Sequence, residues 1–405
     1  MIKLQATRAR NAVWGLFFVM GLVSMAWIPR IPEIKTANGL SDAAFGLVLV
    51  SSSVGAVIGA NLAGRLIHRF GSRPAIYWAI VVVPMGVVVM ALSAAAWVLA
   101  IGLFVMGFGY AALDVGGNAQ AVAIEKHLAK RYITSFHGMW SLGTLAATLF
   151  GGFVSHVMTP GQNLLLVAGV GFLWFLFLTF RLLPVSLDGH QGDEEETLSG
   201  SVPWIGVAVL PLLLMGIGAG VSFIAEGAAA DWGALLLRDF LGIEKGFYAT
   251  AFASFSVAMI ASRFIGDKLL ERYGPYLVVR VMGVTGGLIW AVGLWLGIWL
   301  SPVMPVAALV IVNIGFFAAG MAIGPMAPAF ILGAANLKGI APSVGIARVG
   351  VISIGAYFVG PSVVGGLSDL FTLPWAMMYP AMALVFAGYL ARVLRSSVIL
   401  PNSGL

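Results

Sequence analysis

The chain has 405 residues, of which 60% are hydrophobic and only 9% are charged, and its mean hydropathy is +1.01. A soluble domain carries roughly 25% charged residues and could not bury this much apolar surface, so composition excludes a water-soluble globule. The absence of cysteine excludes disulfides and thiolate metal sites. The 22 Lys and Arg residues are spread among loops rather than gathered in a stripe, which argues against nucleic acid as a partner.

Continuous apolar runs between short polar breaks predict twelve membrane-spanning helices. A span needs about 20 mostly apolar residues, and stretches such as 79–98 satisfy this, whereas a β-barrel would show short alternating strands. The N-terminal run has no small-x-small cleavage site, so it is interpreted as an uncleaved first span. The spans are expected to begin near Asn11, Ala43, Ala75, Trp97, Phe136, Leu164, Trp204, Phe247, Tyr276, Pro302, Ala341 and Leu373.

The distribution of basic residues predicts the orientation of the chain. Only Arg30, Lys35, Arg238 and Lys245 fall in odd-numbered loops. By the positive-inside rule, both termini are expected in the cytoplasm of a multi-pass inner-membrane protein.

One long hydrophilic stretch, residues 184–203, follows the sixth span and contains the acidic run 193–196. It is interpreted as a solvated cytoplasmic linker, with a regulatory or cation-binding role as the alternative. The linker divides the chain into two expected six-helix bundles, residues 1–183 and 204–405.

A short basic loop occurs once in each half. Residues 64–73 read GRLIHRFGSR after span two, and residues 266–274 read GDKLLERYG after span eight. The expected gating residues of these loops and of the span before the second loop are Gly64, Arg69, Gly71, Arg73, Arg263, Gly266, Asp267, Glu271 and Arg272. The alternative is that the basic loops only set topology.

Two six-helix halves with a repeated basic loop resemble the major facilitator superfamily, whose loop motif is G-x-L-x-D-R-x-G-R-R. The first copy departs from that motif because His68 stands where an acid is usual, whereas the second keeps Glu271. The resemblance implies an all-α membrane protein of twelve transmembrane helices in two pseudo-symmetric bundles. It also implies a carrier that is not an enzyme and needs no cofactor or metal. In the family the motif acid helps to latch the halves, so the first latch is expected to be weak or pH-sensitive.

Asp114 is the carboxylate expected within an apolar span of the first half. Its spacing of four residues from Asn118 places both side chains on one helix face. A charged group in hydrocarbon costs a few kcal/mol, about 2.5–3.5 by insertion scales, and removal from water favours the protonated form of a carboxyl group. Asp114 is therefore the expected proton carrier. The alternative is a permanent ion pair with Arg30, and Glu226 of the other half could be a partner carboxylate for Asp114.

The pattern Asp114-x-x-x-Asn118 is similar to the E-x-x-x-N of the fucose-permease-like branch. Residues 137–143 also resemble that branch's Q-x-F-N-S-F-G, with His137 in place of Gln. Together with residues 226–232, 263–266 and 359–361, these motifs look like a related bacterial inner-membrane group whose substrates are mostly unassigned. The resemblance implies proton-coupled sugar uptake, but the first span lacks the acid that fucose-type carriers have there.

The sequence therefore predicts a secondary active transporter that takes up a small polar solute, such as a sugar or sugar derivative, with protons. Its expected partners are that solute, protons and membrane lipids, and it is expected to be a monomer. Proton coupling is assigned to Asp114 and Glu226. The expected solute contacts are Asn118, Gln120, His137, Trp140, Trp27, Arg30 and Asn313.

Each of these assignments has an alternative. The tryptophans could belong to an interfacial belt, the histidine and Asn313 could serve packing or backbone bonding, and Glu226 could be a mouth residue or gate. Proton-coupled efflux of an amphipathic compound is the alternative function, and a non-transporting sensor or lipid scramblase is the third class.

Overall fold

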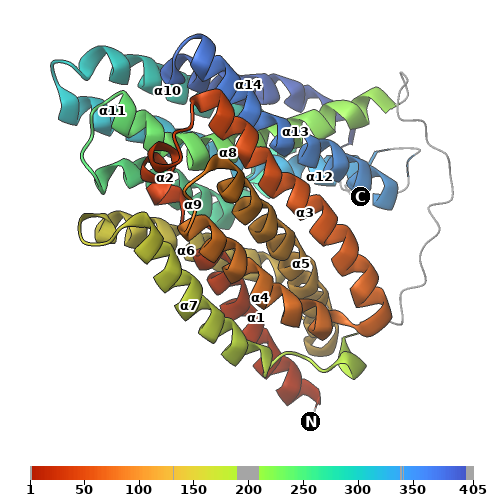
Figure 1. Ribbon diagram of the computed structural model, residues 1–405. Helices are drawn as coiled ribbons and strands as arrows, with labels where there is room; N and C mark the ends of the chain where they lie inside the picture. Colours follow the sequence, from red (N-terminus) through yellow and green to blue (C-terminus); the bar gives the residue numbers. More distant parts are fainter. Residues whose placement is uncertain (1, 131, 189–208, 338–339, 341, 398–405) are drawn as a thin grey trace. The chain divides into compact units, whose positions relative to one another are not determined.

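The computed structural model describes residues 2–130, 132–188, 209–337, 340 and 342–397 (Figure 1). Three predicted features lie outside this part of the chain: residues 189–203 of the linker, the start of the seventh span at Trp204 and the start of the eleventh span at Ala341. Helices account for almost all the regular structure of the described residues.

The chain folds into two compact units. The first comprises Met1–Glu196 and Glu244–Ala249, and the second comprises Thr197–Ile243 and Thr250–Leu405. The sequence prediction had placed all of residues 204–405 in the second bundle, so the segment Glu244–Ala249 is an addition to the first.

The first unit contains seven helices within the described residues. These are α1 Ile2–Ser24, α2 Ile31–Ala37, α3 Asp42–Phe70, α4 Ser72–Ala91, α5 Ala96–Leu128, α6 Ile133–Phe153 and α7 Pro160–Thr179. The described part of the second unit contains α8 Leu210–Asp239, α9 Thr250–Tyr273, α10 Pro275–Leu300, α11 Pro305–Ile323, α12 Met326–Ala335, α13 Pro342–Leu370 and α14 Leu373–Leu390. All of these helices except the short α2 and α12 match an expected span. Ten segments of the described chain combine span length with apolar composition, and the all-α membrane architecture is confirmed.

Glycines fix the position of α5, the helix that carries Asp114. A Cβ added at Gly107 would lie 2.1 Å from the carbonyl oxygen of Ser52 on α3. Cβ atoms added at Gly55 and Gly59 of α3 would each lie 2.1 Å from a carbonyl oxygen of α5. Small residues let membrane helices approach this closely. Consequently α3 and α5 pack backbone against backbone, and they run side by side in Figure 1.

The chain breaks its helix after α1 and turns through a 3₁₀ segment, η1 (Ile28–Arg30), into α2. Pro29 and Pro32 lie in the first turns of these two segments, where a missing N–H costs no helix bond. This turn carries Arg30 inward, so that its side chain is fully buried.

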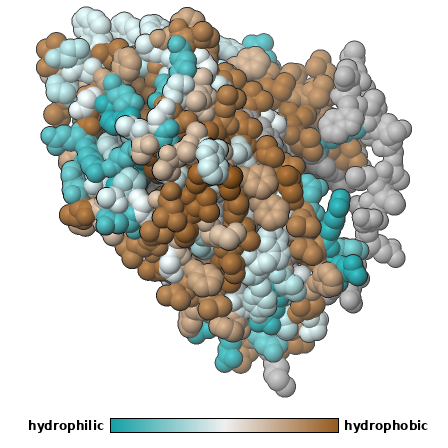
Figure 2. Space-filling view, viewed as in Figure 1, coloured by the Kyte–Doolittle hydropathy of each residue, from teal (hydrophilic) through white to brown (hydrophobic). Residues whose placement is uncertain are grey.

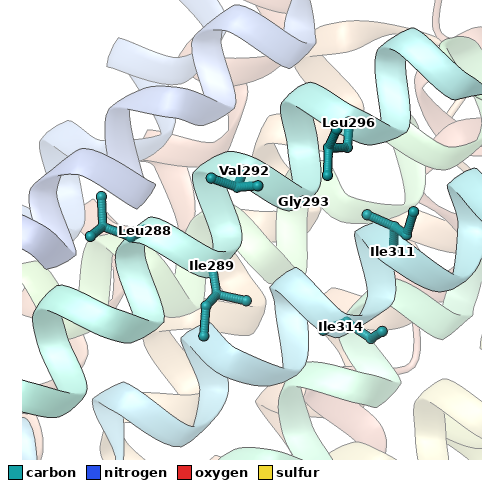
Figure 3. Close-up of a pocket in the computed structure, with 7 residues that line it drawn as sticks. All are labelled: Leu288, Ile289, Val292, Gly293, Leu296, Ile311 and Ile314. Atoms are coloured by element: carbon teal, nitrogen blue, oxygen red, sulfur yellow. The ribbon is translucent and has the colours of Figure 1, made fainter.

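Apolar side chains predominate on the face drawn in Figure 2. On the second unit, α10 and α11 enclose a groove of about 350 Å³, whose lining is shown in Figure 3. The lining consists of Leu288, Ile289, Val292, Gly293, Leu296, Ile311 and Ile314. A groove without a polar group offers nothing to orient a polar solute, so we assign it to the lipid-facing surface.

Candidate functional site

A line of hydrogen-bonded polar side chains connects α5 with α6 in the first unit. Asn118 Nδ2 donates to the carbonyl oxygen of Asp114 at 2.9 Å, and the same side chain interacts with the Asp114 carboxyl group. Asn118 Oδ1 lies 3.2 Å from Nε2 of His137 on α6. Because an amide oxygen can only accept, Nε2 must carry the proton in this arrangement. The amide of Asn118 thus contacts the imidazole of His137 and the main chain of Asp114, whose carboxyl group lies beside it.

An aromatic ring from α1 holds the imidazole in place. Phe17 meets His137 edge to face, with ring centroids 5.1 Å apart, and stacks on Phe136 at 6.0 Å. A Cβ added at Gly117 of α5 would lie 3.0 Å from Phe17 Cε2. A glycine at this position therefore makes room for the phenyl ring that orients the histidine.

Trp140 lies one helical turn after His137, so both side chains project from neighbouring positions on α6. The indole Nε1 is buried and has no acceptor among the described residues. A buried Trp N–H ordinarily finds a hydrogen-bond partner. This donor is therefore available to a hydroxyl or carbonyl oxygen of a bound solute.

Asp114 does not pair with Arg30, which contradicts that alternative from the sequence. Arg30 Nε instead lies 2.5 Å from Glu33 Oε2, and Nη2 donates to the carbonyl oxygen of Met158 at 2.8 Å. Glu33 also binds Lys245 of the segment Glu244–Ala249, at 2.6 Å. The first span itself has no acid, but Glu33 of α2 lies close to its end. Glu33 pairs with Arg30 and not with Asp114.

Trp27 is buried, with only 5% of its surface exposed, and meets Phe45 of α3 at 6.4 Å. It therefore packs inside the first unit and does not have the lipid-exposed position that an interfacial belt requires. Neither Trp27 nor Arg30 is bonded to the series that contains Asp114.

Gln120 lies apart from the group on α5 and α6. Its Nε2 donates to Ser72 Oγ at 2.7 Å and to the carbonyl oxygen of Leu183 at 3.1 Å, and its Oε1 accepts from Leu183 N at 2.9 Å. The side chain is completely buried, and both amide protons are engaged. Gln120 fastens α4 and the chain after α7 to α5, so its amide group is occupied by helix packing.

The first basic loop shows a second fastening that the sequence did not indicate. Gly71 has a φ of +84°, and the next residue, Ser72, donates from its N–H and its hydroxyl to Asp188 Oδ2 at 2.7 and 2.8 Å. Arg73 donates to two carbonyl oxygens at the end of α7, at 3.3 and 3.4 Å. Asp188 was predicted only as linker, because its role depends on the fold rather than on a motif. Gly64 and Arg69 are exposed on α3.

Unit two holds the other predicted polar residues. Glu226 is half-buried on α8, and the charge of Arg263 on α9 acts on it electrostatically. Asn313 of α11 accepts from Ser254 Oγ at 3.0 Å and donates to Thr250 Oγ1 at 3.2 Å, which ties α11 to α9.

The second basic loop forms the end of α9 and the turn before α10. Gly266 is buried, whereas Glu271 and Arg272 are exposed. The side chain of Asp267 lies outside the described part of the structure.

The described residues hold no group of three or more potential metal ligands.

Asp231 of α8 is a further acidic residue, outside those predicted for the site. The side chain is buried, with 9% of its surface exposed, and the residue lies eight positions before the end of the helix. The run of small residues around it, 227–230, is the signal that could have indicated a packed interior.

Comparison with known proteins gives a consistent result. A family model described as Major Facilitator Superfamily matches residues 13–345. An uncharacterised transporter of Sinorhizobium fredii is 30% identical over 397 residues, covering 94% of this chain and 96% of its own length. An uncharacterised MFS-type transporter of Yersinia pestis is 29% identical over 380 residues, which are 93% of each chain.

One solved structure with a similar fold is a bacterial homologue of the human lysosomal transporter Spinster, in an inward-facing and occupied conformation. It matches with a TM-score of 0.75 and 15% identity, covering 96% of this chain and 97% of that one. At this level of identity the likeness concerns the fold alone.

Proposed function

The chain belongs to the Major Facilitator Superfamily and is a multi-pass secondary transporter of that kind, and we propose that it takes up a small polar solute together with protons. The proposed solute class is a sugar or sugar derivative. The observation that carries this proposal is that Asn118 contacts both Asp114 and His137 inside the membrane-spanning part of the first unit.

Asp114 is the proposed proton carrier. It occupies α5 within a segment of span length and apolar composition, and it forms no ion pair with a basic residue of the described chain. Transfer of a carboxyl group out of water disfavours its charged form, so such a group takes up a proton more readily than one in solution. A permanent salt bridge would have removed this capacity, and Arg30 is engaged with Glu33 instead.

The polar and aromatic side chains predicted for the site on α5 and α6 suit a hydroxylated solute. Trp140 offers an unpaired indole donor, and its ring presents an apolar face of the kind that packs on a sugar ring. Asn118 and His137 offer groups that both donate and accept. A solute hydroxyl that displaced the contact between Asn118 and His137 could bond to both of them, which would link solute binding to the side chain that touches Asp114.

The mechanism that follows has four steps. Asp114 binds a proton from the outer side, and the neutral carboxyl group lets the solute dock against Asn118, His137 and Trp140. The carrier then changes conformation, and loss of the proton to the cytoplasm resets it. We propose that Glu226, on the second unit, contributes a further ionisable group, on which the charge of Arg263 acts.

The test begins with a thermal-unfolding screen of sugars, polyols and sugar acids on the purified full-length protein at two pH values. In a symporter the proton and the solute promote each other's binding, so the affinity for a stabilising solute should rise as the pH falls. In the alternative, an efflux antiporter, they compete, and the affinity should fall. The pH dependence therefore distinguishes the two directions of coupling.

Two variants make the screen specific. Asp114→Asn should remove the pH dependence of solute binding while the protein stays folded. Asp239→Asn is the matched control, because Asp239 is an exposed residue at the end of α8 that pairs with Arg238. A pH dependence that persists unchanged in Asp114→Asn would contradict the role proposed for Asp114.

A further inference from the structure

Three arginines of the second unit gather around one aromatic ring at the start of α10. The guanidinium carbon of Arg395 lies 3.9 Å from the centroid of the Tyr276 ring, and that of Arg280 lies 5.7 Å from the same centroid. Arg280 also donates to the Tyr276 hydroxyl. The charge of Arg392 acts on Tyr276 as well. We call Arg280, Arg392 and Arg395 the arginine cluster.

Among the described residues, the arginine cluster has no acidic partner. Within the part of the chain that the structure describes, none of its three members forms an ion pair with Asp or Glu. Two guanidinium groups over one ring lie no farther apart than about one Debye length, which is roughly 8–10 Å at physiological ionic strength, so they repel each other. A bound anion would convert this repulsion into attraction.

Helix packing places the cluster beside α14. The arginines come from α10 and from η6 (Ala391–Ser397), the 3₁₀ segment that directly follows α14. A Cβ added at Gly388 of α14 would lie 3.0 Å from the carbonyl oxygen of Arg280, so the two helices touch here. Figure 1 shows α10 and α14 as neighbours. By the distribution of basic residues, this end of the unit is expected to face the cytoplasm.

Exposed apolar side chains border the cluster on both helices. On α10, Leu277 is 45% and Val281 is 49% exposed. On α14, Phe386 is 53% and Tyr389 is 49% exposed. In a membrane-spanning unit, such side chains face the hydrocarbon of the lipid. The surface therefore combines unneutralised positive charge with an adjoining apolar rim.

We propose that the arginine cluster binds the phosphate group of an anionic phospholipid of the cytoplasmic leaflet, whose acyl chains lie on the apolar rim of α10 and α14. Arginine binds phosphate well because its planar guanidinium offers paired donors. Basic sites between transmembrane helices on the cytoplasmic side are known to hold anionic head groups. The apolar rim favours a lipid over free phosphate, since a soluble anion would gain nothing from it.

The test measures how lipid stabilises the purified full-length protein in detergent. Dioctanoyl phosphatidylglycerol is titrated, dioctanoyl phosphatidylcholine and inorganic phosphate serve as separate probes, and the midpoint of the rise in Tm gives the apparent affinity. Each arginine near an anionic surface contributes roughly a five-fold change in affinity. The double variant Arg280→Gln with Arg395→Gln should therefore bind phosphatidylglycerol about 25-fold more weakly.

Two further variants guard against an effect on folding. Arg392→Gln changes an exposed side chain, and should weaken binding roughly five-fold by the same reasoning. Arg181→Gln is the matched control, because Arg181 also lies over an aromatic ring, 4.3 Å from the centroid of Phe177, but in the first unit. It should leave the affinity unchanged.

The outcomes separate the possible ligands. Stabilisation by phosphatidylglycerol alone, lost in the cluster variants and kept in Arg181→Gln, supports the proposal. Equal stabilisation by phosphatidylcholine would overturn it, because the head-group charge would then be irrelevant. Equal stabilisation by inorganic phosphate would replace the lipid with a soluble anion. An unchanged affinity in Arg392→Gln and in the double variant would remove the site altogether.

Discussion

Gln120→Leu tests whether this side chain fastens helices or contacts the solute. Leucine has a similar volume but removes three bonds, one to Ser72 Oγ and two to the main chain of Leu183. Side-chain hydrogen bonds in membrane proteins contribute on average about 0.6 kcal/mol and at most about 1.7 kcal/mol each. The loss should therefore lower the free energy of unfolding by about 2–5 kcal/mol.

The assay for this variant is reversible unfolding of the purified protein in detergent micelles titrated with dodecyl sulfate. Asn61→Leu is the control, since Asn61 is exposed and bonds only to the carbonyl oxygen of Val57 within the described chain, and it should cost less than about 1 kcal/mol. The affinity of folded Gln120→Leu for a solute found in the screen should equal that of wild type. A stable variant with lost solute affinity would refute the fastening role.

Three further changes test the packing and the site. Gly107→Ala would place its Cβ 2.1 Å from a main-chain oxygen of α3, so the free energy of unfolding in the same assay should fall by about 1–3 kcal/mol or more. Gly138→Ala is the control, because its Cβ would enter open space and should leave the free energy of unfolding unchanged. Glu33→Gln leaves the buried arginine of η1 without its counter-charge, so the free energy of unfolding should fall by about 3 kcal/mol. Lys245→Gln removes only the more exposed partner of Glu33, so it should cost less than about 1 kcal/mol. His137→Gln keeps a donor for the amide oxygen on α5, so it should remain folded and bind solute more weakly, and an unchanged affinity in isothermal titration would assign the histidine to packing.

The span pattern was predictable because hydrocarbon imposes it. A helix is an arrangement in which a single chain segment satisfies its own backbone groups in lipid, so apolar runs of sufficient length must become helices. The placement of Glu244–Ala249 was not predictable in this way. The segment contacts α6 and η1, and its Lys245 pairs with Glu33, so its position involves residues far apart in the sequence.

Helix geometry explains which part of the site the sequence could indicate. A spacing of four residues placed Asp114 and Asn118 on one face, and the structure shows them in contact. Gln120 lies only two residues after Asn118, a step of about 200° around the helix axis, so it projects to the opposite side. The bond from Asn118 to His137 required the crossing of two helices, which no local pattern specifies.

The hydrogen bonds from Ser72 to Asp188 could not be predicted from the sequence either. Its carboxylate reaches Ser72 only because the chain after α7 returns to the start of α4. The acidic residues of this stretch looked like part of a solvated linker, and hydrophilic composition does not distinguish a linker residue from one that bonds a helix end. Gly71, with its φ of +84°, marked the turn but not the partner.

The most direct measurement of the proton-carrier role compares two kinds of transport in proteoliposomes, using the solute found in the screen. Gradient-driven accumulation requires proton coupling, whereas exchange of labelled for unlabelled solute at equal pH does not. Asp114→Asn should abolish accumulation and keep exchange, and Asp239→Asn should keep both. Accumulation at the wild-type level in Asp114→Asn would contradict the account.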